Sequence, residues 1–325
     1  MAGISRDFEP QDGQLNVTES RMLGFPPSEL SELETICGNV STDRSSCTAK
    51  VYTKNLAREH PIDAPWQQPL YSNGAYQLLS YAFENITNSS FPQALQICLF
   101  NRLNMTDTYS SLPPPAAPGL IPFDVADSAW NQTFNEGGAE GDMYSSAADL
   151  VKLGQSIMNH ALLTPIDTRR WLKPLSHTSS LRYSVGMPWE IYRRSPVPNH
   201  TLHSVDLFNK AGDIGPYHAN FALVPTYNAG YTLIGGGNGS LLALDDAVVD
   251  KILLGLDSIA HAQAKRNIAG TYKNGAKSNI TLAIEDNVPG VNVTGLFTNG
   301  TDLIETEASG KLVGVTLRLA NETLV

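Results

Sequence analysis

Three consecutive residues, Tyr71, Ser72 and Asn73, precede an apolar pattern of helical spacing and carry groups that could take part in chemistry. A phenol at a helix start, with a cation nearby to lower its pKa, can act as a general base, and a carboxamide two residues further on can hold a substrate carbonyl. Such tripeptides are also common by chance, and a capped helix with a half-buried tyrosine would contain the same residues. The triplet alone leaves both interpretations open.

The helix that must position this triplet is predicted to begin at Asn73, its N-cap by residue type, which leaves Tyr71 on the preceding loop. The apolar residues Leu79, Phe83 and Ile86 recur at helical spacing and are expected to be buried along one face. The helix is therefore expected to present the tyrosine at its N-terminal end.

A long connection rich in proline, glycine and alanine spans residues 112–140. Connections of this length inside a globular chain are more often site-forming loops than linkers. The helix after it has Ser146 as its predicted N-cap and Asp149 three residues further on, which is the spacing of a capping box. Its buried stripe is expected to comprise Leu150, Leu153 and Ile157.

In the second half of the chain the apolar period changes from helical to alternating, which predicts strands. These are 183–185, 189–192 and 204–208, followed by a hairpin of 220–225 and 231–235. A helix from Leu242 to about Ala262 is predicted to lie across the sheet, since its apolar residues recur every four positions. They are Leu244, Val248, Ile252 and Leu256.

After about residue 266 the sequence changes to short alternating runs separated by glycine and asparagine, which predicts a small β module. We therefore expect two domains, residues 1–265 and residues 266–325. The last alternating run is interrupted at Val325, so the module is expected to be incomplete.

Length and composition place the chain among globular proteins, with 325 residues of which 42% are hydrophobic. The net charge of −10 disfavours nucleic acid and anionic membrane surfaces as partners, and no apolar run reaches the roughly 18 residues of a membrane span. Seven scattered histidines provide no set of metal ligands, so neither a metal nor another cofactor is expected. His203 and His218 flank the Lys210 strand and could line a cleft, but a structural hydrogen-bonding role is expected for each. A small molecule is the expected partner, and the oligomeric state is left open.

The sequence has twelve Asn-x-Ser/Thr sequons, more than chance would give. Because this tripeptide carries glycans only in the secretory pathway, their density indicates a secreted glycoprotein. The first residues lack the apolar segment of a signal peptide, so we expect that the written start is not the natural one. The sequons are at Asn16, Asn39, Asn85, Asn88, Asn104, Asn131, Asn199, Asn238, Asn279, Asn292, Asn299 and Asn321.

Three cysteines give further, weaker support for export. Cys37 and Cys47 lie within one polar loop, and a disulfide between them would suit an oxidising compartment. Two reduced thiols remain the alternative. Cys98 lies in an apolar helical pattern over residues 91–102 and is expected to be an inert core thiol.

Three segments resemble, in order and spacing, the class C β-lactamase-related serine hydrolases, above all their fungal members. They are the triplet 71–73, the run 141–150, and the stretch from Lys210-Ala211-Gly212 to Pro225. The resemblance covers about residues 1–262, and the β appendage is also similar to one in those members. It implies an α/β (α+β) fold, with a β-lactamase/transpeptidase-like antiparallel sheet flanked by helices, a helical subdomain, an incomplete N-terminus and a small C-terminal β module.

The resemblance also implies a role for each motif residue. Tyr71 would take and return protons, and Asn73 would contact the substrate carbonyl. Lys210 would hold the phenolate and polarise the substrate. Gly212 would let the strand backbone approach the acyl group, with the backbone N–H of Asp213 as one oxyanion donor.

Two features depart from the family pattern. Ala211 stands where the family usually has Thr or Ser, which removes a hydroxyl that could bind the carboxylate of penicillin-like acids. No lysine has a serine three residues before it, so the family's Ser-x-x-Lys pair is absent. Cys47 and Lys50 have that spacing in the wrong part of the chain, and a disulfide cysteine is the better interpretation. The start at Met1 is similar to the segment that follows the family's serine helix, so we expect a truncation just after the nucleophile.

Two functions follow as hypotheses. The first is a serine hydrolase or acyltransferase that acts on an ester, amide or lactone of a small molecule, in fungal secondary metabolism. The second is a secreted, non-catalytic binding protein that retains the substrate pocket of the family. Retention of Tyr71, Asn73 and Lys210 counts mildly against the second, because unused polar groups only cost burial energy.

Overall fold

The computed structural model describes residues 48–57, 61–125, 128, 130, 138–196, 203–239, 241–275, 277–286, 290–304 and 316–317. The chain forms two compact units. The first comprises Met1–Ser156, Ala211–Ala219 and Ile234–Gly239, and the second comprises Ile157–Lys210, Asn220–Leu233 and Ser240–Val325.

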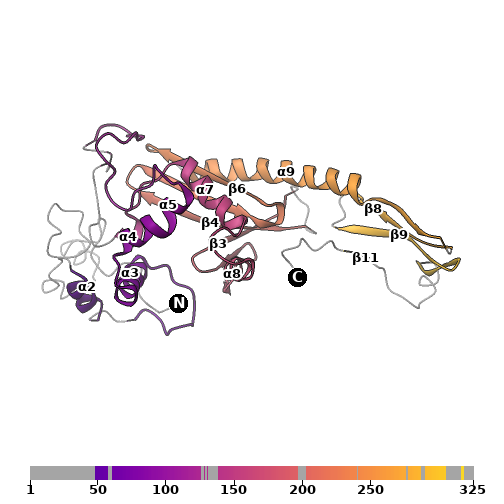
Figure 1. Ribbon diagram of the computed structural model, residues 1–325, viewed down its shortest axis with the longest axis horizontal. Coiled ribbons are helices and arrows are strands. Elements are labelled where there is room, and N and C mark those ends of the chain that lie inside the picture. Colours follow the sequence, from indigo (N-terminus) through magenta and orange to yellow (C-terminus); the bar gives the residue numbers. More distant parts are fainter. Residues whose placement is uncertain are drawn as a thin grey trace, which may run out of the picture. The chain divides into compact units, whose positions relative to one another are not determined.

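Most of the regular secondary structure described in the first unit is helical (Figure 1). The helices are α2 (Ala49–Leu56), α3 (Asn73–Thr87), α4 (Phe91–Leu95), the π-helical turn η1 (Gln96–Phe100), α5 (Asn101–Leu103), α6 (Gly138–Gly141) and α7 (Ala147–Met158), whose last two residues belong to the second unit. An antiparallel bridge between Tyr109 and Tyr144 joins the segment after α5 to the segment before α7.

Helix α3 starts one residue away from the predicted position. Its N-cap is Ser72, not Asn73: Ser72 has an extended backbone, and its hydroxyl accepts the N–H of Ala75 at 3.0 Å. Asn73 is the first helical residue. A serine oxygen can satisfy one of the unpaired N–H groups of the first turn as well as an asparagine can, so residue type alone could not separate the two.

The predicted buried face of α3 was wrong. Leu79 is 63% exposed and Ile86 is 81% exposed, whereas the buried residues of this helix are Gly74, Gln77 and Ser80. Helix α3 contacts α6 and α4. Contacts with other helices can override a local hydrophobic pattern, so the pattern did not predict which face of α3 is buried.

The expectation of a core thiol at Cys98 was also wrong. Cys98 is a free and exposed cysteine within η1. A π-helical turn holds more residues than an α-helical turn, so it rotates the following side chains relative to an unbroken helix. Phe100 is the buried residue of this turn, with 2% of its surface exposed. The proposed partners Cys37 and Cys47 lie outside the described residues.

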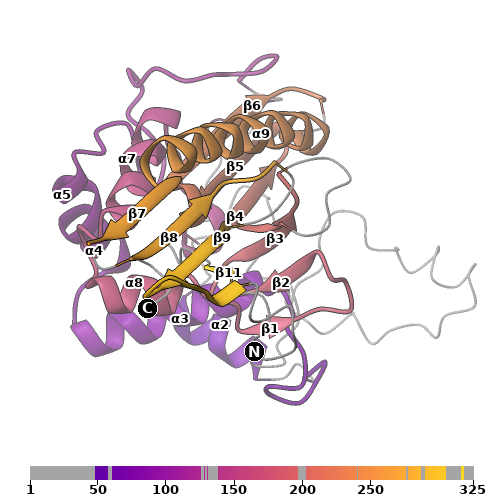
Figure 2. The ribbon, with the colours of Figure 1, turned by 90° about the vertical axis from the view of Figure 1, so that its right-hand side faces the viewer.

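A six-stranded sheet follows in the order β1-β2-β3-β4-β5-β6 (Figure 2). Its strands are β1 (Ser176–His177), β2 (Tyr183–Val185), β3 (Glu190–Arg194), β4 (Val205–Ile214), β5 (Tyr217–Val224) and β6 (Ala229–Gly236), and helix α8 (Pro165–Trp171) precedes them. The pairs β1–β2, β2–β3 and β3–β4 are antiparallel. The predicted hairpin is β5–β6, and β4 is longer than predicted because it continues through Lys210 and Gly212.

Helix α9 (Leu241–Asn267) packs across β4 and β5 (Figure 2). Its residues Val249 and Leu253 join Val205, Leu207 and Val224 in one buried cluster. Burial of each such side chain stabilises the folded state by about 1.5–3 kcal/mol, so this cluster is the main contact between the helix and these strands.

The predicted face of α9 was displaced by one residue. Leu244 is 53% exposed, and Val248, Ile252 and Leu256 are only partly buried. The buried residues are Val249 and Leu253, each one position after a predicted residue. The aliphatic residues of this helix lie on more than one side, so the pattern did not distinguish between adjacent faces.

The C-terminal region forms a separate antiparallel sheet in the order β10-β9-β8-β7, with β11 also paired to β9. Its strands are β7 (Gly270–Asn274), β8 (Ser278–Ala283), β9 (Val291–Thr298), β10 (Thr301–Asp302) and β11 (Thr316–Leu317). The mixed α/β architecture with antiparallel sheets and helices agrees with the predicted fold class. Within the described ranges, no helix combines the length and the apolar character needed to span a membrane.

Candidate active site

Within the Tyr71 triplet, one residue caps the helix and the other two flank that cap. Ser72 is buried and serves as the cap of α3, whereas Tyr71 is 50% exposed on the loop before the helix. Asn73 follows in the first turn and is partly buried. Tyr71 and Asn73 therefore flank the capping serine, and their roles as base and carbonyl-binding group stay predictions.

Two residues from distant segments hold the start of α3. The hydroxyl of Tyr52, on α2, donates to the Glu140 carboxylate of α6 at 2.6 Å and lies 3.5 Å from the carbonyl of Gly74. The Tyr52 ring also meets Tyr81 edge to face, with 5.5 Å between ring centroids. Sequence reasoning missed Tyr52 and Glu140, because no local pattern indicates a contact over 88 residues.

The second motif, Lys210-Ala211-Gly212, lies on β4. The Lys210 ammonium lies 2.9 Å from a carboxylate oxygen of Glu190 on the neighbouring strand β3, and each side chain is about one-third exposed. Glu190 was also missed. The Glu190 carboxylate balances the positive charge of Lys210, and both residues belong to the second unit.

Gly212 and Asp213 occupy the part of β4 that belongs to the first unit. Both are exposed, and a Cβ built on Gly212 would meet no atom of the described residues within 4 Å. There is thus open space beside this backbone, which a substrate could use. The assignment of the Asp213 N–H as an oxyanion donor stays a prediction.

Asp213 and His218 form a pair that sequence reasoning did not anticipate. The ring Nδ1 of His218 lies 2.5 Å from a carboxylate oxygen of Asp213, and the ring Nε2 lies 3.2 Å from the carbonyl oxygen of Gly237. The hydrogen bond to Asp213 raises the pKa of His218, against the opposing effect of burial. His203 belongs to the second unit, where its Nε2 lies 3.2 Å from the Tyr227 hydroxyl.

The loop between α5 and α7 is tied to the β4–β5 hairpin by aromatic residues. The Tyr144 hydroxyl donates to the carbonyl of Trp130 at 2.8 Å, and the Trp130 ring lies against Tyr144 and against Tyr217 of β5. Burial, followed by the charge of Asp142, raises the pKa of Tyr144 to about 12. Gly119 packs so closely on Trp130 that an added Cβ would lie 1.9 Å from the ring.

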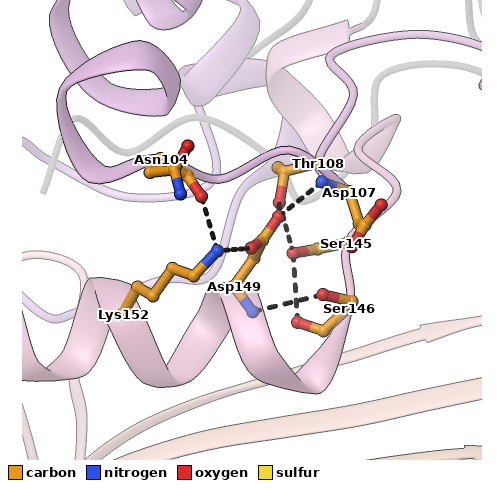
Figure 3. Close-up of polar contacts among 7 residues, drawn as sticks. All are labelled: Asn104, Asp107, Thr108, Ser145, Ser146, Asp149 and Lys152. Atoms are coloured by element: carbon orange, nitrogen blue, oxygen red, sulfur yellow. Dashed lines mark hydrogen bonds and ion pairs between the residues drawn. The ribbon is translucent and has the colours of Figure 1, made fainter.

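The base of this loop is anchored by Asp149 (Figure 3). This carboxylate accepts hydrogen bonds from the Asp107 N–H at 2.8 Å, the Thr108 hydroxyl at 2.9 Å and the Lys152 ammonium at 2.7 Å. The Asp149 N–H in turn donates to the Ser146 hydroxyl at 3.1 Å, which confirms the predicted cap of α7. Burial alone would raise the pKa of Asp149, and the hydrogen bonds from Lys152 and Thr108 outweigh it and leave the pKa lowered.

The structure thus brings some of the predicted residues together within one unit. Tyr71 and Asn73 flank one helix start, and Gly212 and Asp213 adjoin His218; both groups belong to the first unit. Lys210 belongs to the second unit. The idea that all five groups face one cleft stays a prediction.

Seven of the sequon asparagines lie among the described residues. Those at 85, 88, 104, 238 and 299 are exposed, and those at 279 and 292 are partly buried on β8 and β9. Among the described residues, no cluster of three or more His, Cys, Asp or Glu side chains could hold a metal ion. The remaining sequons, Asn16, Asn39, Asn131, Asn199 and Asn321, lie outside the described residues.

The chain is similar to several known proteins. It is 30% identical to a "Beta-lactamase-like protein" of Arthroderma benhamiae over 88% of this chain and 49% of that protein, and 26% identical to the "Probable hydrolase M10" of a Phoma species over 87% and 47%. The chain therefore spans about half the length of these curated relatives. The fold is similar to a β-lactamase/D-alanine carboxypeptidase from Yersinia pestis, with a TM-score of 0.54, 17% identity, and coverage of 67% of this chain and 64% of that one.

Two family models match adjacent parts of the sequence. The model described as "Beta-lactamase-like-like, C-terminal domain" matches residues 260–324, which include the second sheet. The model described as "Beta-lactamase" matches residues 35–250, which include α3, α7 and the whole six-stranded sheet. The chain therefore belongs to the beta-lactamase family.

Proposed function

We propose that this chain carries the proton-transfer and acyl-binding groups of a serine hydrolase or acyltransferase that acts on an ester, amide or lactone of a small molecule. Tyr71 serves as the base, Asn73 binds the substrate carbonyl, and Lys210 supplies positive charge. The N–H of Asp213 stabilises the oxyanion, which contributes about 3 kcal/mol when such a bond is fully formed. The family match and the placement of these residues at a helix start and on β4 support the proposal.

The observation that carries the proposal is the open backbone at Gly212. An acyl carbon can approach a strand closely only where no side chain stands in the way, and a Cβ at this position would point into empty space. The exposure of Asp213 leaves the adjoining backbone accessible as well.

The same region supports a neutral substrate. Ala211 offers no hydroxyl to a substrate carboxylate, so a penicillin-like acid would lack that hydrogen-bond donor. A neutral ester, amide or lactone does not need it. We place such a substrate in fungal secondary metabolism, because two of the relatives are fungal and one is described as a probable hydrolase. The exposed sequons support a secreted glycoprotein.

A second candidate function is a non-catalytic binding protein. The observation in its favour is the absence of a Ser-x-x-Lys pair from these 325 residues. Such a protein would use the same open backbone to bind an ester or lactone without cleaving it.

Covalent trapping separates the two candidates. The chain is incubated with a fluorophosphonate or an activated ester and digested, and modified peptides are identified by mass spectrometry. The enzyme is supported if a residue is labelled and the rate of that labelling falls about 10²–10⁴-fold in Tyr71→Phe. Tyr76→Phe, which changes another partly exposed tyrosine near the same helix start, is the matched control and should leave the rate unchanged.

Absence of labelling, together with saturable binding of the intact ester, would overturn the catalytic role of this chain and support the binding protein. Labelling that is unaffected by Tyr71→Phe would reject the assigned base.

A further inference from the structure

One histidine ring connects three strands at the acyl-binding end of β4. His218 lies on β5, its Nδ1 is 2.5 Å from the carboxylate of Asp213 on β4, and its Nε2 is 3.2 Å from the carbonyl of Gly237, the residue after β6. Gly237 is also bonded on its other side, since its N–H donates to the carbonyl of Pro216 in the β4–β5 turn at 2.8 Å. The ring and this backbone bond therefore fix the same corner of the sheet.

The two partners of the ring determine its protonation state. A backbone carbonyl can only accept a hydrogen bond, and an ionised carboxylate can only accept one. Both ring nitrogens of His218 must therefore donate, which requires the imidazolium cation. The charged group that β4 presents to the ring is the Asp213 carboxylate. The end of β6 presents only the uncharged Gly237 carbonyl, and the neighbours on β5, Tyr217 and Ala219, carry no charge at neutral pH.

We propose that His218 is a positioning residue that, as an imidazolium, clamps Asp213 and Gly237 and so fixes the strand end that presents the Asp213 N–H to the substrate. The role of that N–H rests on the proposed function, whereas the cationic ring and the connection between the strands do not. The clamp is formed at neutral pH and opens as the pH rises through the pKa of the ring, because a neutral imidazole can donate to only one of its two partners.

Nuclear magnetic resonance of the ¹⁵N-labelled chain tests the clamp directly. At pH 7 both ring nitrogens of His218 should carry protons, and Asp213→Asn should move the midpoint of the ring titration to lower pH. In His218→Gln, which cannot become a cation, the Gly237 amide should exchange with solvent about two- to fivefold faster, the range expected for loss of a partly exposed ion pair.

His177→Gln is the matched control. His177 Nδ1 lies 3.0 Å from the Ser184 hydroxyl, which can donate or accept, so its contact does not require a cation. This substitution should leave exchange at Gly237 unchanged. A ring nitrogen of His218 without a proton at pH 7, or an unchanged midpoint in Asp213→Asn, would overturn the clamp.

The rate of covalent labelling tests the positioning role. In the wild-type chain the labelling rate should decline at high pH as the His218 ring loses its proton. His218→Gln should be labelled more slowly and should not show this decline. His177→Gln should show the wild-type labelling rate and the wild-type decline. A His218→Gln pH profile identical to the wild-type profile would reject the positioning role. A chain that never labels but shows the doubly protonated ring would reject the proposed function and leave the clamp intact.

Discussion

Two aspartates of the first unit each lie within hydrogen-bonding distance of a basic side chain, but in opposite environments. Asp149 lies 2.7 Å from Lys152 and its side chain is 1% exposed, whereas Asp213 lies 2.5 Å from His218 and its side chain is 67% exposed. Around Asp149 a hydroxyl and a backbone N–H complete the hydrogen bonding that burial demands. The distance between the charged atoms therefore does not tell which pair contributes more to stability. Burial makes the Asp149 pair important for stability, whereas exposure keeps the contribution of the Asp213 pair to stability small.

The largest effect should come from removal of the buried carboxylate. Asp149→Ala leaves the Asp107 N–H without its acceptor and reduces the side-chain bonding of Thr108 to its contact with Ser145, and it should lower the free energy of unfolding by about 3 kcal/mol. Asp213→Ala is the matched control at an exposed position, with an expected change of less than about 1 kcal/mol. Urea denaturation of the three proteins measures both values. Equal losses in the two variants would refute the contrast.

Acid should break the Asp149 pair selectively. The folded-state pKa of Asp149 is lowered, so its contribution to stability is complete above the unfolded value of about pH 4 and is lost as the pH falls through the folded value. The wild-type free energy of unfolding should therefore decline below about pH 4, and the decline should be shallower in Asp149→Ala. Denaturation series between pH 2 and 7 measure the two slopes. Parallel curves for both proteins would show that Asp149 does not titrate as stated.

Ser146→Ala separates the helix cap from the carboxylate bonds. It removes the hydroxyl that accepts the Asp149 N–H and leaves the carboxylate itself in place, so it should cost about 1 kcal/mol. Ser72→Ala, which removes the cap of α3, should cost a similar amount. Urea denaturation again gives both values. A loss for Ser146→Ala as large as that for Asp149→Ala would mean that the cap, rather than the carboxylate, holds this network.

The smallest effect on stability should come from the exposed pair, with the opposite dependence on pH. The pKa of His218 is raised, so its contribution is complete below the unfolded value of about 6.5 and is lost as the pH rises through the folded value. Wild type and His218→Gln should thus differ by less than about 1 kcal/mol at pH 6 and converge at high pH. Thermal unfolding at several pH values measures the difference. A gap that widens towards high pH would contradict the assignment.

Local features of the first unit were predictable and longer-range ones were not. The cap of α7 could be inferred because Ser146 and Asp149 are three residues apart, so the bond between them forms within one turn. The buried face of α3 could not be inferred, because its neighbours come from α4 and α6 and the contact partner of its first turn is Tyr52. In α9 the pattern indicated a helix on the sheet but not which of two adjacent faces would be buried.

The sequence by itself determined which chemical groups are available: a phenol and a carboxamide at a helix start, and a lysine and a glycine on one strand, in the order shared with the beta-lactamase family. Only the tertiary structure decided their partners. Glu190 reaches Lys210 because of the register between β3 and β4, and His218 reaches both Asp213 and Gly237 because three strands meet at one corner. Strand register arises from packing across the sheet, and a contact that depends on it is not visible in either segment alone.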